Sequence, residues 1–164
     1  MASSRSNRRA EVWRSLFRIG LGVFWLYFAS QKWPAPLGLG SSLHGIGWMQ
    51  PLMEQAARVN PVPGLHAFLV QVVVPNWTFF AGAQAVAETA VGVLLILGLA
   101  TRPAALVATL LALNLSLTVA FTIGDFGVRW LYYLPVLAGI EVFVNGGGAW
   151  AVDRSRAVPA WLRS

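Results

Sequence analysis

Two polar side chains, Glu88 and Asn114, stand near the middle of long apolar segments, where a carboxylate can carry a proton or bind a ligand. If both segments cross a bilayer as helices, both residues lie roughly 17 to 18 Å from its inner edge, in a core about 30 Å thick. An ionised carboxylate at that depth costs about 2.5 to 3.5 kcal/mol. Glu88 must therefore be paired, protonated or in contact with water.

Two neighbours are candidates to satisfy Glu88. Lys32 can reach toward it from the outer end of the first apolar segment, and Asn114 can hydrogen-bond it in either protonation state. Two interpretations stay open. Glu88 is a carboxylate that handles a proton or binds a ligand, or it is a satisfied packing group.

Arg18 and Glu141 form a second polar pair. Calculated with the same rise per residue, both lie within about 10 Å of the inner edge of the membrane. The matched height predicts a structural ion pair that fixes the fourth apolar segment against the first. Arg18 can instead extend to the inner headgroups.

Other side chains could complete a ligand site. Gln84 shares the helical face of Glu88, while Trp25, Tyr27, Tyr132 and Tyr133 could stack on a flat ligand such as a quinone or could simply pack. Three charged residues either shape an outer anion site or are solvated loop charges: Arg58, Asp125 and Arg129.

No metal or haem site is expected. The chain has no Cys, which excludes disulfides and thiolate-held iron-sulfur clusters. His44 and His66 lie outside the apolar segments and lack a carboxylate at ligand spacing, so they are expected to be loop histidines. Any redox cofactor must then belong to a partner.

The composition is that of an integral membrane protein. Of 164 residues, 57% are hydrophobic and only 11% are charged. Four segments are long and apolar enough to cross a bilayer of ordinary thickness, at residues 13–33, 77–100, 103–124 and 129–146. The first is expected to be a retained span, because no signal-peptide cleavage site follows it.

Charge placement predicts the orientation. The formal charge is +6, and basic residues cluster in the first 12 residues and in residues 153–164. Such clusters mark the cytoplasmic side of a membrane, and four spans put both termini on that side. Because these arginines flank apolar segments directly, a nucleic-acid-binding role is not expected.

The stretch 34–76 holds six of the nine prolines and is expected to be an outer loop. Within it, residues 46–59 and 64–74 are amphipathic but too short to cross, which predicts two helices lying over the outer mouth of the bundle.

Helical phase predicts how the spans pack. Each has one face that carries most of its polar residues, at coiled-coil-like or i, i+4 spacing. The predicted fold is an all-α, integral membrane four-helix bundle with these faces turned inward. The four faces are Arg18, Gly22, Trp25, Ala29 and Lys32; Gln84, Glu88 and Gly92; Asn114, Thr118 and Thr122; and Tyr133, Leu137, Glu141 and Asn145.

Several of these residues carry a family resemblance. The chain resembles the DoxX/DoxD family of four-helix membrane proteins in Arg18 to Gly22, in Gln31-Lys32, in Glu88 with Gly92 to Arg102, and in Gly146 to Asp153. The resemblance implies a membrane subunit of a quinone-linked oxidoreductase, the best described being a thiosulfate:quinone oxidoreductase. Glu88, Lys32 and Arg102 match motif positions to which the family assigns no secure role.

The resulting hypothesis is a multi-pass subunit in the cytoplasmic membrane of a prokaryote, with quinone as a substrate and partner subunits that carry the redox cofactors. Glu88, with Lys32 and Asn114, would handle a proton, and a set of four residues would bind quinone or substrate: Gln84, Tyr27, Tyr133 and Arg129. The alternatives are a noncatalytic subunit that anchors or assembles a larger membrane complex, and a small transporter or channel.

Overall fold

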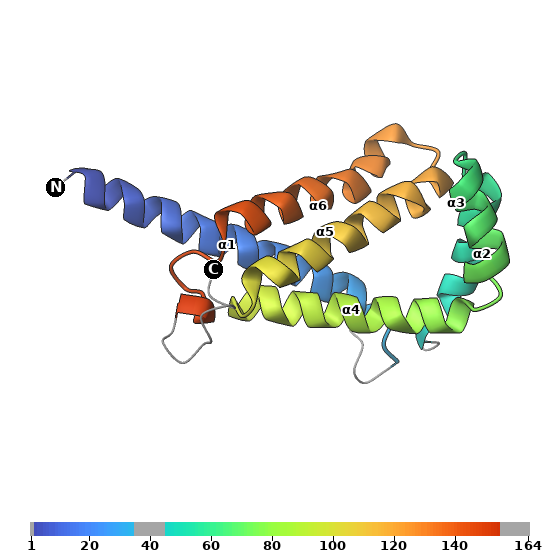
Figure 1. Cartoon of the computed structure of the whole chain (residues 1–164), viewed down its shortest axis with the longest axis horizontal. Coiled ribbons are helices and arrows are strands. Elements are labelled where there is room, and N and C mark those ends of the chain that lie inside the picture. Colours follow the sequence, from blue (N-terminus) through green and yellow to red (C-terminus); the bar gives the residue numbers. More distant parts are fainter. Residues whose placement is uncertain (1, 35–44, 155–164) are drawn as a thin grey trace.

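The computed structural model describes residues 2–34 and 45–154, with the backbone alone at residues 2–6 and 154. This part of the chain is helical and contains no strand. Four long helices run along the bundle, and two short ones, α2 (Met49–Val59) and α3 (Pro63–Phe68), cross one end of it (Figure 1). The long helices are α1 (Ala2–Ser30), α4 (Trp77–Leu97), α5 (Thr101–Leu117) and α6 (Phe126–Asn145).

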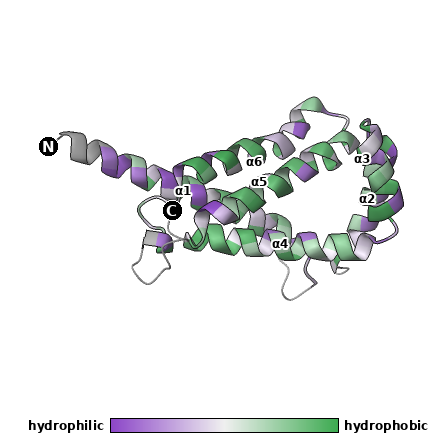
Figure 2. Cartoon of the chain, in the orientation of Figure 1, coloured by the Kyte–Doolittle hydropathy of each residue, from purple (hydrophilic) through white to green (hydrophobic). Residues whose placement is uncertain are grey.

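Three helical stretches are long and apolar enough to cross a membrane: α4, α5 with the short helix η3 (Val119–Thr122), and α6. Figure 2 shows apolar residues along these helices and hydrophilic residues gathered on the first turns of α1. The expected all-α membrane protein is confirmed. Helix α1 is not among the three, since Arg14 and Arg18 interrupt its apolar half, and its crossing at residues 13–33 stays a prediction.

The helix ends differ slightly from the predicted ones. Helix α1 begins already at Ala2, because no Pro or Gly interrupts the basic N-terminal residues. Helix α4 stops at Leu97, where Gly98 adopts φ +67° and Leu99 N–H bonds to the Leu94 carbonyl at 3.0 Å.

The packing confirms the predicted inner faces of α1 and α4. Arg18, Trp25 and Glu88 are each 0% exposed. The two helices approach closely at Gly22 and Gly92: a Cβ on Gly22 would lie 2.9 Å from the Gly92 carbonyl oxygen. Small residues permit such backbone contact in membrane bundles.

The predicted inner face of α6 is wrong. Leu137 is 60% exposed and Asn145 is exposed, whereas Pro135, Gly139 and Val142 are buried. The cause is the packing of α6 on α5, where Gly139 lies against Thr109 and leaves no room for a larger side chain.

The predicted ion pair between Arg18 and Glu141 is also wrong. Glu141 accepts a hydrogen bond from Asn145 Nδ2 at 3.0 Å, on the exposed side of α6. Arg18 is buried and donates to main-chain carbonyls, and the carboxylate that interacts with it electrostatically is Asp153 rather than Glu141. The acceptors of Arg18 are Leu95, Ile96, Gly147 and Trp150.

Asp153 closes the α4–α5 turn, although it was predicted to belong to the basic cytoplasmic tail at residues 153–164. The side chain is 0% exposed and accepts from Ala100 N at 2.6 Å and Thr101 N at 2.8 Å. These are free donors at the start of α5, and a carboxylate there also favours the helix dipole. Ala100, held at φ +49°, is a non-glycine residue in the left-handed region. The other predicted tail residues, 155–164, lie outside the described part.

The two short helices predicted over the bundle mouth are present. We call residues 45–73 the cap: the 3₁₀ turn η1 (Gly45–Trp48), α2, α3 and the π-helical turn η2 (Leu69–Val73). Two hydrogen bonds attach the cap to the bundle. Asn60 Nδ2 donates to the Leu117 carbonyl at 2.7 Å, and Trp48 Nε1 donates to the Gln31 carbonyl at 3.0 Å. The cap therefore bridges the ends of α1 and α5.

Asp153→Ala is expected to lower the free energy of unfolding by about 2 to 4 kcal/mol, because it leaves two main-chain N–H groups buried without acceptors. Thermal unfolding in detergent measures the loss. Asp125→Ala is the matched control: Asp125 caps α6 through Val128 N at 3.0 Å but is exposed, so about 1 kcal/mol is expected. Equal losses would contradict the closing role of Asp153.

Candidate functional site

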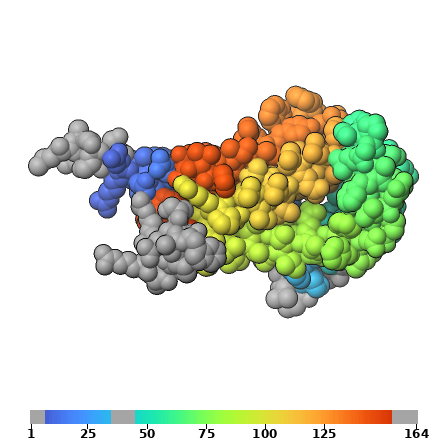
Figure 3. Space-filling view, viewed as in Figure 1, coloured from blue at the N-terminus to red at the C-terminus, as the bar shows by residue number. Residues whose placement is uncertain are grey.

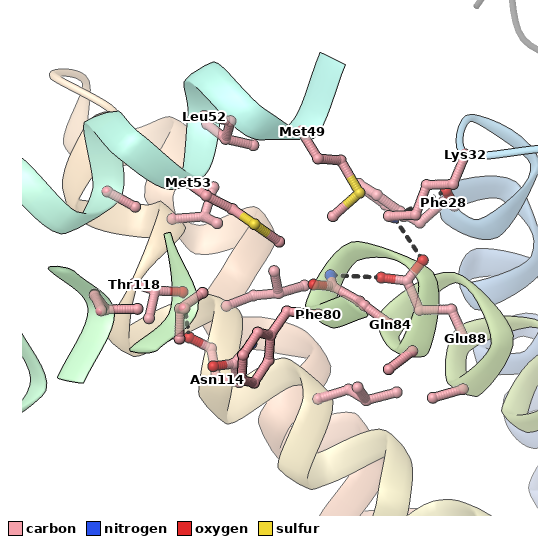
Figure 4. A pocket seen from close by; sticks show the side chains of 18 of the residues that line it. Phe28, Lys32, Met49, Leu52, Met53, Phe80, Gln84, Glu88, Asn114 and Thr118 are labelled. Carbon is pink, nitrogen blue, oxygen red and sulfur yellow. Dashed lines mark hydrogen bonds and ion pairs between the residues drawn. The ribbon is translucent and has the colours of Figure 1, made fainter. Parts of the chain in front are cut away.

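A cavity of about 430 Å³ lies between the cap and the neighbouring ends of α1, α4, α5 and α6. Figure 3 shows the cap packed against this end of the bundle, and Figure 4 shows side chains from the cap and from three of the long helices converging on the cavity. Its volume falls within the usual range of small-molecule sites, about 300 to 1,000 Å³.

Most of the cavity wall is apolar. The cap contributes Met49, Leu52, Met53 and Phe68, and Phe80 of α4 stands among them (Figure 4). Methionine side chains adapt to irregular shapes, and aromatic rings offer flat faces. This wall suits a hydrophobic, flat ligand.

A buried ion pair forms the polar corner. Lys32 Nζ lies 2.6 Å from Glu88 Oε2, with the two side chains 3% and 0% exposed. Gln84 Nε2 donates to the other carboxylate oxygen at 2.9 Å, and Lys32 also donates to the Phe28 carbonyl at 3.1 Å. The ammonium lies 5.9 Å from the centre of the Trp48 ring. The prediction that the Lys32 side chain extends to Glu88 is confirmed.

The α1–α4 contact positions this pair. The helices run side by side, and their close approach at Gly22 and Gly92 sets their spacing below the cavity. At the cavity end, Trp33 Nε1 donates to Thr89 Oγ1 at 2.9 Å. Lys32 lies between these two contacts and folds back along α1 to meet the carboxylate.

Asn114 lies across the cavity from the ion pair (Figure 4). In the described residues its side chain makes no hydrogen bond, so the predicted bond to Glu88 is absent. Thr118 Oγ1 donates to the Asn114 carbonyl at 2.6 Å, and Tyr132 is another of the lining residues. The Asn114 amide is thus available to a ligand.

Three predicted site residues lie elsewhere. Tyr27 is 60% exposed on the outside of α1. Tyr133 packs edge-on against Trp130, with ring centres 5.8 Å apart, and Arg129 Nε donates to the Ile123 carbonyl at 2.7 Å. None of them lines the cavity. The adjacent tyrosine, Tyr132, occupies the position predicted for Tyr133.

The cap residues were missed as site residues. The amphipathic pattern of its sequence predicted an apolar face. In the structure this face lies over the end of the bundle and forms one wall of the cavity. The methionines on that face are the signal that could have identified them, because methionine is frequent in adaptable binding surfaces.

His66 shows no ligand geometry. His66 Nδ1 lies 2.7 Å from the Ala57 carbonyl, within the cap, and His44 lies outside the described residues. Among residues 2–34 and 45–154, no group of three or more potential metal ligands comes together.

The site therefore combines an apolar cavity, an adaptable wall, a buried carboxylate–ammonium pair and an amide on the opposite side. Such a site can enclose the ring of a hydrophobic ligand and offer hydrogen bonds at two of its edges. Glu88 lines the cavity, and both of its carboxylate oxygens accept hydrogen bonds, Oε2 from Lys32 and Oε1 from Gln84.

Comparison with known proteins identifies one family. The profile of the DoxX family matches residues 14–121, which is more than half of the chain and includes both members of the ion pair. No curated protein and no solved structure gives a significant match.

Lys32→Met is expected to lower the free energy of unfolding by about 3 kcal/mol, because it leaves the Glu88 carboxylate buried without its counter-charge. The double variant Lys32→Met with Glu88→Gln removes both charges and is expected to recover most of the loss. Thermal unfolding in detergent gives both values. Additive losses in the double variant would show that the two side chains do not interact.

Proposed function

The chain belongs to the DoxX family of membrane proteins, and we propose that it is a membrane subunit of a quinone-linked oxidoreductase. The quinone ring occupies the cavity between the cap and the bundle. The observation that carries the proposal is the buried Lys32–Glu88 pair in the wall of an otherwise apolar cavity of about 430 Å³.

The cavity has the hydrogen-bonding groups that this ligand needs. A quinone has two carbonyl oxygens on opposite edges of a flat, apolar ring. The Asn114 amide supplies a donor on one side, and Lys32 supplies one on the other. Phe80 and Met53 cover the ring faces in this arrangement (Figure 4).

A bound quinone that is reduced accepts two electrons and two protons; Glu88 delivers the protons one at a time and takes up each from the aqueous phase. Glu88 holds a proton at Oε2 in place of its bond to Lys32, and Gln84 keeps the carboxylate oriented through Oε1. Lys32 offsets the charge that remains on Glu88 after the proton leaves. The cap excludes water from the ring.

Electrons come from a partner subunit that carries the redox cofactors, and thiosulfate is the electron donor that the family resemblance favours. Of the three cations expected to attract an anionic substrate at the outer face, Lys32, Arg58 and Arg129, two are bonded within the chain. Lys32 is paired with Glu88, and Arg129 is bonded to the Ile123 carbonyl. Oxidation of an anionic substrate is therefore assigned to the partner.

Quinone binding is tested with a photoreactive azidoquinone on the purified chain in nonionic detergent. Cross-links are expected in residues 45–73 and in α4, mapped by mass spectrometry. Asn114→Leu, which loses one hydrogen bond, is expected to weaken binding about three- to tenfold. Ala87→Phe, which fills the cavity, is expected to abolish it.

Two controls separate the cavity from the outer surface. Val86→Phe adds the same ring to the exposed side of α4, and Tyr27→Phe removes a hydroxyl from the outside of α1. Both should bind the probe as the unchanged chain does. Cross-linking that is equal in Ala87→Phe and Val86→Phe would refute a quinone site in this cavity.

The noncatalytic alternative has one observation in its favour. Both oxygens of Glu88 are already hydrogen-bonded, as a purely structural carboxylate requires. The two functions differ in the effect of Glu88→Gln on the complex solubilised gently from its native membrane. If the chain takes part in quinone reduction, Glu88→Gln is expected to lower the quinone reduction rate per assembled complex at least about tenfold. An unchanged rate with lower assembly would establish the structural role.

A further inference from the structure

A second hollow lies on the outside of the bundle, between α1 and α6. Helix α1 packs mainly on α4, and α6 mainly on α5. The contact between α1 and α6 is small, and a groove of about 530 Å³ runs along it. Its walls are apolar and largely exposed, for example Leu16, Phe17 and Leu134.

The groove has unfilled space at its centre. Gly20 lines it, and a Cβ built on Gly20 would meet no atom within 4 Å. The glycine is therefore not required by the packing of α1 on its neighbours. It leaves room on the side of α1 that faces α6.

Two arginines stand at one end of the groove. Arg8, Arg9, Trp13 and Leu16 line a shallow hollow on the part of α1 that projects from the bundle (Figure 1), and Trp13 and Leu16 also line the groove. The two hollows are thus continuous, with the cationic residues at the outer end and the apolar residues along the helices.

These arginines have no counter-charge within the described chain. Neither Arg8 nor Arg9 forms an ion pair there, whereas Arg14, on the next turn, bonds to Glu11 at 3.0 Å. Trp13 is 70% exposed beside them. Tryptophan is enriched at the level of the lipid headgroups, and arginine binds phosphate through two parallel hydrogen bonds.

We infer that this groove is a binding site for one anionic phospholipid. The phosphate lies on Arg8 and Arg9, the Trp13 ring lies at the headgroup level, and an acyl chain lies along the groove beside Gly20. Charge complementarity favours this occupant over a transmembrane helix of a partner, because the arginines would then remain without an anion. The inference does not depend on quinone binding, since neither the groove nor the arginine-lined hollow shares a lining residue with the cavity under the cap.

The inference is tested by native mass spectrometry of the purified full chain in a neutral detergent. The probes are phosphatidylglycerol and phosphatidylcholine with identical acyl chains. We expect one tightly bound phosphatidylglycerol and a clear preference for it over phosphatidylcholine. The double variant Arg8→Gln, Arg9→Gln should weaken phosphatidylglycerol binding about 10- to 30-fold.

A matched variant tests whether the arginine positions matter. Arg102→Gln removes a charge from an exposed residue at the start of α5, outside both hollows, and should leave the preference unchanged. Equal binding of the two lipids by the unchanged chain would overturn the inference. A preference that survives in the Arg8/Arg9 variant would also overturn it.

A third variant tests the acyl-chain part of the site. Gly20→Leu places a side chain in the open part of the groove. It should weaken the binding of both lipids without lowering the thermal stability of the protein. If Gly20→Leu leaves lipid binding unchanged and instead releases a second copy or a co-purifying protein, the occupant is a helix and the lipid site is refuted.

Discussion

The contact between Lys32 and Glu88 sets the main constraint on this bundle, because two charges buried among apolar helices are stable only together. The pair fixes how far α1 extends beside α4 and which faces of the two helices meet. The glycines at the α1–α4 crossing bring the backbones close enough for the lysine to reach the carboxylate. Because α4 also forms one wall of the cavity, the same pair determines where a ligand finds polar groups.

The two ends of the bundle are built differently. At one end, Arg18 and Asp153 bond mainly to main-chain groups around the α4–α5 turn. At the other end, the cap leaves a cavity. These hydrogen bonds lie away from the candidate site, and adaptable side chains such as Met49 and Met53 line it.

The sequence predicted the elements well, because apolar length and turn residues are local signals. Gly98 ends α4 and Asp125 caps α6, so α4 ends and α6 begins three residues before the predicted residues 100 and 129. The Lys32–Glu88 pairing followed from depth and helical phase, since both residues lie on faces that also carry small residues. Tyr27 and Tyr133 do not line the cavity, because helical phase does not specify which residues of a lipid-exposed helix turn outward.

Arg18 makes contacts that the sequence did not predict. Its matched depth with Glu141 indicated an ion pair, and extension to the inner headgroups was the alternative. The actual acceptors are carbonyls of a helix end and of a glycine-rich loop, which have no side-chain signature in the sequence. The role of Asp153 was missed for the same reason, since its partners are main-chain amides distant in sequence.

The cap also allows the shape of the cavity to change independently of the stability of the bundle. Its helices line the cavity but contribute neither member of the buried ion pair, and few side-chain hydrogen bonds attach them to the bundle in the described chain. Substitutions on the inner side of α2 and η2 can therefore alter the shape and volume offered to a ligand while the bundle stays intact. Related chains can diversify in what they bind by varying this one segment.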